Sequence, residues 1–241
     1  MSNLNIDKVS VNINQRQILH EVSLSINLDG AVVGILGPNG AGKSTLFKCI
    51  TGFDRSYDGH ISLDTKNLNP LAPSLRTTQG LGYLPQESWL FQDLSVRQNL
   101  LLFGELQGLK GSKLNDCVDR SLEEMKIKHL EKSNSAKLSG GEKRRLEFAR
   151  TLMFSPKILL LDEPFTGIDP KTVEEITKII KDLKSKKISV FISDHQADTI
   201  LKLVDYVFIL FDGKVIKSGS PEEVKNNQQV KDIYLGNTLD N

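Results

Sequence analysis

Eight consecutive residues near the N-terminus have the types and the spacing needed to surround a phosphate. Residues 37–44 read GPNGAGKS and fit the pattern G-x-x-x-x-G-K-[ST]. Glycines let backbone N–H groups turn toward phosphate oxygens, because no Cβ stands in the way. Lys43 could place a positive charge on the β- and γ-phosphates, and the Ser44 hydroxyl could bind Mg²⁺. The stretch therefore predicts a nucleotide-phosphate site rather than a glycine-rich turn without a ligand.

Two adjacent carboxylates follow a short apolar run in the second half of the chain. Residues 157–164 read KILLLDEP, so Asp162 and Glu163 stand directly after the run. Mg²⁺ prefers oxygen ligands and keeps several waters, and we expect Asp162 to hold it through water. We expect Glu163 to polarise an attacking water, a task that typically contributes ~10²–10⁴-fold in rate. The alternative is a strand end that merely exposes two acids, which the phosphate-binding stretch makes the weaker interpretation.

Gln86 and His195 also follow apolar segments. They lie in GYLPQES and VFISDHQ, respectively. Strands of a parallel sheet end on the side where ligands bind, so His195 could reach a γ-phosphate. The amide oxygen of Gln86 could join the metal shell with Ser44 and Asp162. Taken alone, each would be an ordinary surface or core residue.

A second glycine-rich helix start lies about a hundred residues after the first. Residues 138–145 read LSGGEKRR, and Ser139 with Glu142 fits the S-x-x-E capping box. Two adjacent glycines, Gly140 and Gly141, are more than a cap needs, and they allow close approach of a phosphate. The alternative for these residues alone is a plain helix cap. The KRR at 143–145 is interpreted as a solvated face.

The elements that must position these residues follow from the hydrophobic pattern. Residues 4–11 and 18–28 alternate apolar and polar side chains, as half-buried strands do. Short apolar runs at 31–36, 157–164, 188–193 and 206–211 predict strands buried on both faces. Helices are expected after Lys43, over most of 95–155, after Asp169-Pro170 and after Ser220. The alternation predicts a parallel-sheet α/β core with a helical insertion near 87–150.

Composition limits the classes of protein that need to be considered. The 241 residues are 39% hydrophobic and 25% charged, typical of a globular domain, and a net charge of +1 gives no basic field for nucleic acid. Cys49 and Cys117 lack metal-ligand spacing and are expected to be unpaired thiols in a reducing cytosol. The sequence shows no signal-peptide pattern, and its apolar runs are too short to span a bilayer. Any membrane role is therefore expected to be peripheral.

The set of motifs, in this order, resembles the ATP-binding cassette (ABC) family over roughly residues 4–235. In that family LSGGE is the signature motif, and two domains bind head to tail so that each signature completes the partner's ATP site. The resemblance implies that Ser139, Gly140, Gly141 and Glu142 act in a homodimer, facing the ATP of a second copy. It also implies Glu163 as the catalytic carboxylate.

The resemblance assigns several further roles. It makes Gln86 the Q-loop glutamine, His195 the switch histidine and Asp169 part of the D-loop, with Mg²⁺ as the cofactor of ATP. An aromatic residue usually stacks on adenine near position 13, but Ile13 stands here, so adenine would have only apolar contact, aided by the stem of Arg16. The implied ATP contacts are Ile13, Gly37, Pro38, Asn39, Gly40, Ala41, Gly42, Lys43, Ser44 and Thr45.

The implied fold is that of a P-loop NTPase, an ABC-type nucleotide-binding domain with an antiparallel β subdomain and a helical insert. Residues 1–241 would form this single domain, with 1–86 and 151–241 as the nucleotide-binding core and about 87–150 as the helical signature subdomain. Stretches such as GLGYLPQES, LSVRQNL, SDHQADTI and VKDIYLG look similar to the branch that powers lipopolysaccharide export in Gram-negative bacteria. Branched-chain amino-acid importers and soluble cassette ATPases such as those of iron–sulfur assembly are the alternatives.

A partner surface is expected just after the Q-loop glutamine. Trp89, the only tryptophan, is followed by Leu90 and Phe91, and aromatic residues of this kind anchor partner helices. By the resemblance, they line a groove for the coupling helices of two integral-membrane subunits; the alternative is ordinary core of the insert. The resemblance places the protein on the cytoplasmic face of the inner membrane, with no contact to nucleic acid or to the cargo.

Overall fold

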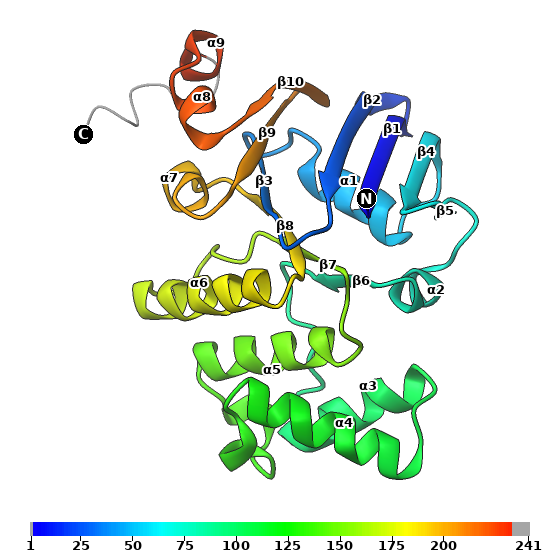
Figure 1. Cartoon of the computed structure of the whole chain (residues 1–241), viewed down its shortest axis with the longest axis vertical. Coiled ribbons are helices and arrows are strands. Elements are labelled where there is room, and N and C mark those ends of the chain that lie inside the picture. The colour runs from blue at the N-terminus through cyan, green and yellow to red at the C-terminus, as the bar shows by residue number, and fades with distance from the viewer. Residues whose placement is uncertain (1, 233–241) are drawn as a thin grey trace.

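The computed structural model describes residues 2–232 as two β-sheets with helix α1, Lys43–Thr51, packed against both and most of the other helices beside the second sheet (Figure 1). The last part of the VKDIYLG stretch, residues 233–236, lies outside the described part of the chain. The termini of the described chain lie at the sheet end of the molecule, and a group of helices forms the opposite end (Figure 1). Cys49 and Cys117 are both buried and free, as predicted.

Four strands from the first quarter of the chain form an antiparallel sheet in the order β2-β1-β4-β5. Their bounds are β1 Asn3–Ile13, β2 Arg16–Asn27, β4 Tyr57–Leu63 and β5 Lys66–Asn67. Buried and exposed residues alternate along the second half of β2, as they do where one face of a sheet meets the core and the other meets water. The two predicted alternating strands are confirmed.

A second sheet holds six strands in the order β10-β9-β3-β8-β7-β6. The bounds are β3 Val32–Leu36, β6 Leu81–Leu84, β7 Ile158–Asp162, β8 Ser189–Asp194, β9 Tyr206–Phe211 and β10 Lys214–Gly219. Neighbouring strands run parallel except β10, which is antiparallel to β9 at the edge. Every residue of β3, β7 and β8 is buried, which confirms the strands predicted from continuous apolar runs.

Helix α1, Lys43–Thr51, shares one apolar core with strands of both sheets. On this helix the Phe47 ring lies 5.0 Å from that of Phe191 in β8. The helix is capped at its C-terminus by Gly52, whose φ of 82° is a left-handed conformation that favours glycine. Packing from both sides fixes the direction of α1, and its N-terminus follows the carboxyl end of β3.

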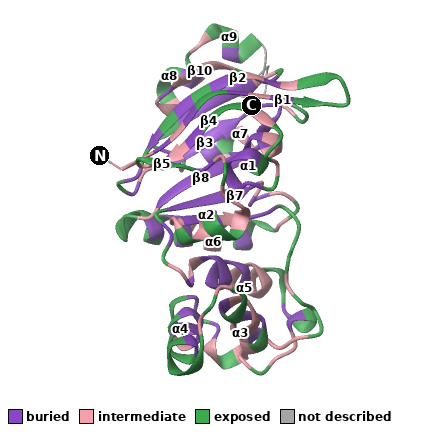
Figure 2. Ribbon diagram, turned by 90° about the vertical axis from the view of Figure 1, so that its right-hand side faces the viewer, coloured by how far each residue is buried: buried purple, intermediate pink, exposed green. Residues whose placement is uncertain are grey.

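Three helices, α3 Val96–Leu106, α4 Gly111–Glu124 and α5 Gly140–Leu152, gather at the end of the molecule away from the antiparallel sheet (Figures 1 and 2). Their apolar sides belong to the same core as one face of the parallel sheet. The remaining helices are α2 Pro73–Thr78, α6 Pro170–Ser185, α7 Ala197–Leu201, α8 Pro221–Lys225 and α9 Gln228–Val230, with single 3-10 turns at Lys128–Leu130 and Ser135–Lys137.

The predicted helix starts are capped by side chains. Ser95, Ser139 and Ser220 each form a complete capping box with the Gln or Glu three residues later, at the starts of α3, α5 and α8. Asp169 caps α6, and its carboxylate accepts hydrogen bonds from the N–H and the hydroxyl of Thr172 at 3.1 and 2.7 Å. These caps satisfy N–H groups that helix geometry leaves without partners.

Candidate active site

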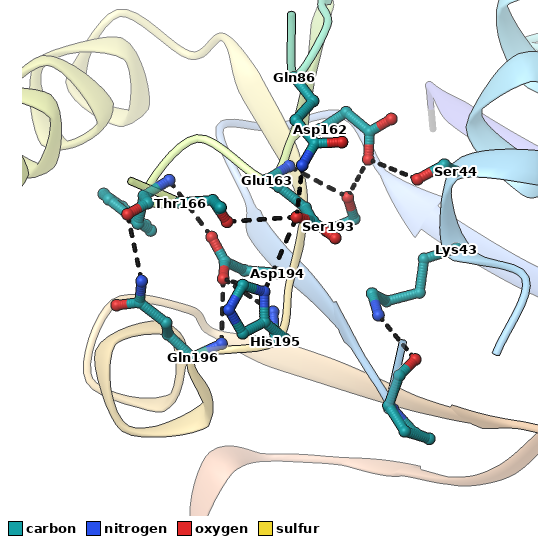
Figure 3. A network of polar contacts seen from close by, with 12 residues as sticks. Lys43, Ser44, Gln86, Asp162, Glu163, Thr166, Ser193, Asp194, His195 and Gln196 are labelled. Carbon is teal, nitrogen blue, oxygen red and sulfur yellow. Dashed lines mark hydrogen bonds and ion pairs between the residues drawn. The ribbon is translucent and has the colours of Figure 1, made fainter. Parts of the chain in front are cut away.

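The polar residues singled out in the sequence lie at the carboxyl ends of four parallel strands. Residues 37–44, which we call the phosphate loop, follow β3, and Gln86 follows β6. Asp162 is the last residue of β7, and His195 comes directly after β8. Figure 3 shows these side chains converging from separate elements on one region. The crossing of the chain between parallel strands thus gathers residues that are far apart in the sequence.

At two positions of the phosphate loop, Gly37 and Gly42, a larger residue would collide with neighbouring atoms. A Cβ on Gly37 would lie 2.0 Å from the carbonyl oxygen of Leu210, in β9. Gly42 has a φ of 104°, and a Cβ there would lie 2.6 Å from a methyl group of Leu19 in β2. Both sheets therefore press against the loop, and only glycine fits without displacing backbone or core atoms.

Lys43 holds its ammonium group within the phosphate loop. The side chain is buried, and Nζ donates hydrogen bonds to the carbonyls of Gly37 at 2.7 Å and Pro38 at 3.0 Å. Burial lowers the pKa of Lys43, an effect opposed by the nearby carboxylates, first among them Glu163. A positive charge held by two neutral carbonyls is well placed to bind an anion that enters the loop.

Asp162 is buried, and both of its oxygens accept hydrogen bonds. Oδ1 accepts from the hydroxyls of Ser193 at 2.5 Å and Ser44 at 3.3 Å, and Oδ2 accepts from the Tyr83 hydroxyl at 3.3 Å. Burial raises the pKa of Asp162, and the hydrogen bonds from the three hydroxyls oppose this rise. The neighbouring oxygens of Ser44 and Asp162 fit Mg²⁺, which is usually bound through one or two carboxylates with phosphates and water completing the octahedron.

Three side chains surround one oxygen of the Glu163 carboxylate (Figure 3). Oε2 accepts hydrogen bonds from Gln86 Nε2 at 2.9 Å and Thr166 Oγ1 at 3.2 Å, and His195 Nδ1 lies 3.7 Å away. The backbone of Glu163 has a φ of 47°, a costly conformation for a residue other than glycine. Its N–H donates to the carbonyl of Ser193 at 2.8 Å, which holds the residue in place. Gln86, Glu163 and His195, singled out separately in the sequence, thus meet at one atom.

Asp194 is fully buried beside the site and was not among the residues predicted from the sequence. Its Oδ1 accepts from the N–H groups of His195 at 2.7 Å and Gln196 at 3.0 Å, and its Oδ2 accepts from the Phe165 N–H at 3.3 Å. Asp194 therefore ties the loop that carries the histidine to the loop that follows Glu163. Tyr83, Thr166 and Ser193 were also missed; the available signal was a polar residue at or near the end of each buried strand.

The signature residues form the start of α5. Ser139 and Gly140 are exposed, and a Cβ on Gly140 would meet nothing within 4 Å, whereas one on Gly141 would lie 3.1 Å from Oε2 of Glu175 in α6. Within residues 2–232 the hydrogen bonds of Ser139 and Glu142 stay inside this helix start, so they do not link the signature to the carboxylates. Thus the single copy leaves open space in front of Gly140.

Ile13 and Asp169 lie apart from the carboxylates. Ile13 ends β1, where it pairs with Arg16, and its side chain is exposed. The Asp169 carboxylate is engaged in capping α6, and the hydrogen bonds from Thr172 lower its pKa. The Asp169 carboxylate therefore stabilises the start of α6 within a single copy.

A cavity of about 580 Å³ opens beside β6 and the helical group. We call it the aromatic groove; the residues that line it include Phe53, Tyr83, Trp89, Leu90, Phe91 and Leu106. The rings of Phe53 and Trp89 are 5.3 Å apart, and Tyr83 lies 5.9 Å from each. The predicted trio of Trp89, Leu90 and Phe91 thus lines one continuous, largely apolar hollow, and Trp89 and Phe91 remain exposed.

The sequence profile of one protein family, described as "ABC transporter", matches residues 19–166. The chain belongs to the ABC transporter family. The chain is 40% identical to the lipopolysaccharide export system ATP-binding protein LptB of Haemophilus influenzae, and the alignment covers 98% of both chains. It is also 40% identical to the protein of that name in Escherichia coli, over 92% of both. The resemblance derived from the motifs is therefore confirmed.

Solved structures of ATP-binding cassettes have the same fold as this family member. The ADP conformation of MJ1267, an ATP-binding cassette of an ABC transporter, superposes with a TM-score of 0.87 at 30% identity, covering 98% of this chain and 99% of that one. CbiO1 of Clostridium perfringens gives 0.83 at 30% identity, covering 95% and 94%. The predicted fold class is confirmed. No helix within residues 2–232 has both the length and the apolar character required to cross a bilayer.

Proposed function

We propose that this chain is the ATP-hydrolysing subunit of a transporter that extracts lipopolysaccharide from the inner membrane for export to the outer membrane. The family supports ATP as the substrate, and relatives named as lipopolysaccharide export proteins over nearly the whole chain support the cargo. The observation that carries the enzymatic part is the meeting of Lys43, Ser44, Asp162 and Glu163 at the strand ends. A binding module without turnover would not need Glu163 held in a strained backbone by several partners.

ATP would bind with its phosphates in the phosphate loop and its base near the end of β1. Backbone N–H groups and the start of α1 would surround the phosphate oxygens. Lys43 would exchange its two carbonyl acceptors for β- and γ-phosphate oxygens. Ile13 would give the adenine an apolar wall without stacking. The proposed contacts are Ile13, Gly37, Pro38, Asn39, Gly40, Ala41, Gly42, Lys43, Ser44 and Thr45.

Asp162 and Ser44 would hold Mg²⁺, with the Gln86 amide as a further oxygen donor. Mg²⁺ held by these residues would supply Lewis-acid stabilisation of the charge that develops on the phosphate oxygens. The hydroxyl of Ser193 fixes the orientation of the Asp162 carboxylate from the side of β8. Such outer contacts commonly matter nearly as much as the ligands themselves.

Glu163 would act as the base. It would orient a water for attack on the γ-phosphorus and accept the proton of that water while the bond from phosphorus to the bridging oxygen breaks. Gln86 and Thr166 already hold one carboxylate oxygen by hydrogen bonds, and His195 lies next to the same atom. The His195 side chain would contact the γ-phosphate.

Two copies would be needed for a complete site. Ser139, Gly140 and Gly141 at the start of α5 would face the γ-phosphate held by the opposite copy, with Glu142 securing the cap and Asp169 lying at the dimer contact. The open space in front of Gly140 supports this arrangement, because a phosphate can approach the helix start there without displacing an atom. Hydrolysis would remove the bridging phosphate contacts and open the homodimer.

The aromatic groove would receive helices of two membrane subunits, with Trp89, Leu90 and Phe91 as anchors. Rigid, half-exposed aromatic rings around an apolar hollow are suited to this task. The helical subdomain, about residues 87–150, would move with these partners relative to the core of 1–86 and 151–241. The protein would then be peripheral on the cytoplasmic face of the inner membrane.

Glu163→Gln tests the proposed base. The variant should bind ATP and form the ATP-dependent dimer, while its turnover should fall by ~10²–10⁴-fold, as expected when a positioned base is lost. Glu123→Gln is the matched control, because Glu123 is exposed on α4 and the change in charge is the same. ATP hydrolysis at the parent rate by Glu163→Gln would show that the base is wrongly assigned.

Affinity capture from solubilised membranes tests the transport role. Two multi-spanning membrane proteins should be recovered with the tagged chain, and lipopolysaccharide should change the ATPase rate of the complex reconstituted in lipid. A rate that responds to branched-chain amino acids would instead support an importer. Recovery of a soluble scaffold protein alone would support an assembly ATPase.

A further inference from the structure

Tyr83 connects the aromatic groove to the proposed Mg²⁺ site. It lies in β6, next to β7, and its ring forms part of the groove lining. Its hydroxyl donates a hydrogen bond of 3.3 Å to Oδ2 of Asp162 at the end of β7. One side chain therefore has its ring against a surface open to partners and its hydroxyl on the carboxylate that would hold the metal.

On the side of the aromatic groove, the Tyr83 ring contacts two other aromatic rings that a partner could touch. Phe53 and Trp89 pack against the Tyr83 ring, with centroids 5.9 Å away in both cases. These two side chains are 52% and 44% exposed, so a helix seated in the groove would press on them directly. Any shift of these rings changes the packing of Tyr83, because rings at this separation are in contact.

The segment that follows Tyr83 contacts the second carboxylate of the site and the signature helix. Three residues later Gln86 donates to Glu163, so the same segment contacts both neighbouring carboxylates. Three residues beyond that, the carbonyl of Trp89 accepts a hydrogen bond from Arg150, near the C-terminal end of the signature helix α5. Residues 83–91 therefore join the carboxylates, the aromatic groove and the signature helix.

We infer that Tyr83 is a positioning residue through which occupation of the aromatic groove alters the binding of Mg²⁺ at Asp162. The inference rests on the proposed function for the identity of the metal site. Outer hydrogen-bond partners of a metal-binding carboxylate typically change metal affinity by about 10–100-fold when they are removed. Tyr83 is such a partner, and unlike Ser193, which lies in the buried strand β8, it reaches the groove.

The alternative is a purely structural role for this hydroxyl, because a half-buried phenol commonly finds a hydrogen-bond partner. The two roles differ in what they predict for Mg²⁺. A structural hydroxyl changes stability without changing how much Mg²⁺ improves nucleotide binding. A positioning hydroxyl changes this improvement specifically.

The first experiment measures binding of an ATP analogue with a non-hydrolysable β–γ bridge, by calorimetry, in Mg²⁺ and in EDTA. The ratio of the two dissociation constants gives the gain due to Mg²⁺. In Tyr83→Phe this gain should fall by about tenfold, while the affinity in EDTA stays the same. Tyr57→Phe is the matched control, because the Tyr57 hydroxyl donates to Asn69, in the neighbourhood of the antiparallel sheet. An unchanged gain in Tyr83→Phe overturns the inference.

The second experiment tests whether the groove side reaches the metal through this hydroxyl. Trp89→Ala removes a ring contact of Tyr83 and should reduce the Mg²⁺ gain severalfold, whereas Leu75→Ala, at an exposed position on α2 outside the groove lining, should not. Combined with Tyr83→Phe, Trp89→Ala should add no further loss, as expected for residues that act through one contact. Independent, additive losses would overturn the inference.

The outcomes separate this inference from the proposed function. If the parent chain does not bind the analogue more tightly in Mg²⁺ than in EDTA, the proposed Mg²⁺·ATP site is wrong. If the parent shows the gain and Tyr83→Phe keeps it, only the role of Tyr83 is wrong. Urea unfolding of each variant, compared with the parent, shows whether a changed gain comes from a loss of folded protein.

Discussion

Gly140→Asp provides a sharp test of the proposed two-copy site. A Cβ at this position would meet nothing within 4 Å, so a single copy can accept the longer side chain without displacing a neighbour. The position is also the first residue of α5, where an acidic side chain typically stabilises a helix by about 0.3–1 kcal/mol. The free energy of unfolding should therefore stay the same or rise slightly.

The ATP-bound dimer should respond in the opposite way. If Gly140 faces the γ-phosphate of the other copy, the new carboxylate would lie about 4 Å from a phosphate charge. Two like charges at that separation repel by about 4 kcal/mol at an effective dielectric constant of about 20. Since about 1.4 kcal/mol corresponds to a factor of ten, the repulsion at each composite site should weaken association of the two copies about a thousandfold. The dimer contains two such sites, so its formation should be abolished.

Sedimentation velocity in the Glu163→Gln background measures this effect without turnover. The Glu163→Gln chain should dimerise in Mg²⁺·ATP, and the chain that also carries Gly140→Asp should stay monomeric while binding ATP with unchanged affinity. Ser112→Asp is the matched control, because Ser112 is exposed in the first turn of α4. Dimer formation by Gly140→Asp at the same ATP concentration as its parent would refute the composite site.

Two further predictions concern stability. Arg76 is fully buried and donates to the carbonyls of Cys49 and Ile50 near the end of α1 at 2.6 and 2.8 Å, so Arg76→Ala should lower the free energy of unfolding in urea by about 3 kcal/mol. Burial raises the pKa of Asp162 above its unfolded value, so protonation favours the folded state and the associated stability is lost as pH rises. Asp162→Asn should therefore stabilise the ligand-free protein at pH 7, and this gain should shrink toward pH 4 in thermal melts.

Much of the site could be predicted because its motifs are local. The phosphate loop needs consecutive glycines, a lysine and a serine between a strand and a helix, and all of these are neighbours in the sequence. The strands around it were predictable because burial on both faces requires continuous apolar runs. Strand β4 was not predicted, because its burial pattern is irregular, whereas the four-residue β6 was expected only as the apolar segment before Gln86.

Residues that the sequence analysis missed depend on the register of the parallel sheet. Ser193 is the pairing partner of Asp162 on the neighbouring strand, so the two side chains emerge side by side. Tyr83 pairs with Leu160, two residues before Asp162, and residues two apart on a strand share a face. A shift of one residue in either pairing would turn these hydroxyls away. A single sequence does not fix that register, and so these contacts required the structure.

The carboxylates are held by two sets of contacts that differ in kind. From the core side, Ser193 bonds to Asp162 and to the backbone of Glu163, in a buried strand that has no room to move. From the open side, Tyr83 and Gln86 reach the same two carboxylates from a segment that ends at half-exposed rings. A membrane subunit seated in the aromatic groove, as proposed, would reach only the second set. The core contacts would thus keep the strained geometry of Glu163 in every state, while the segment contacts would adjust the site to the state of the partner.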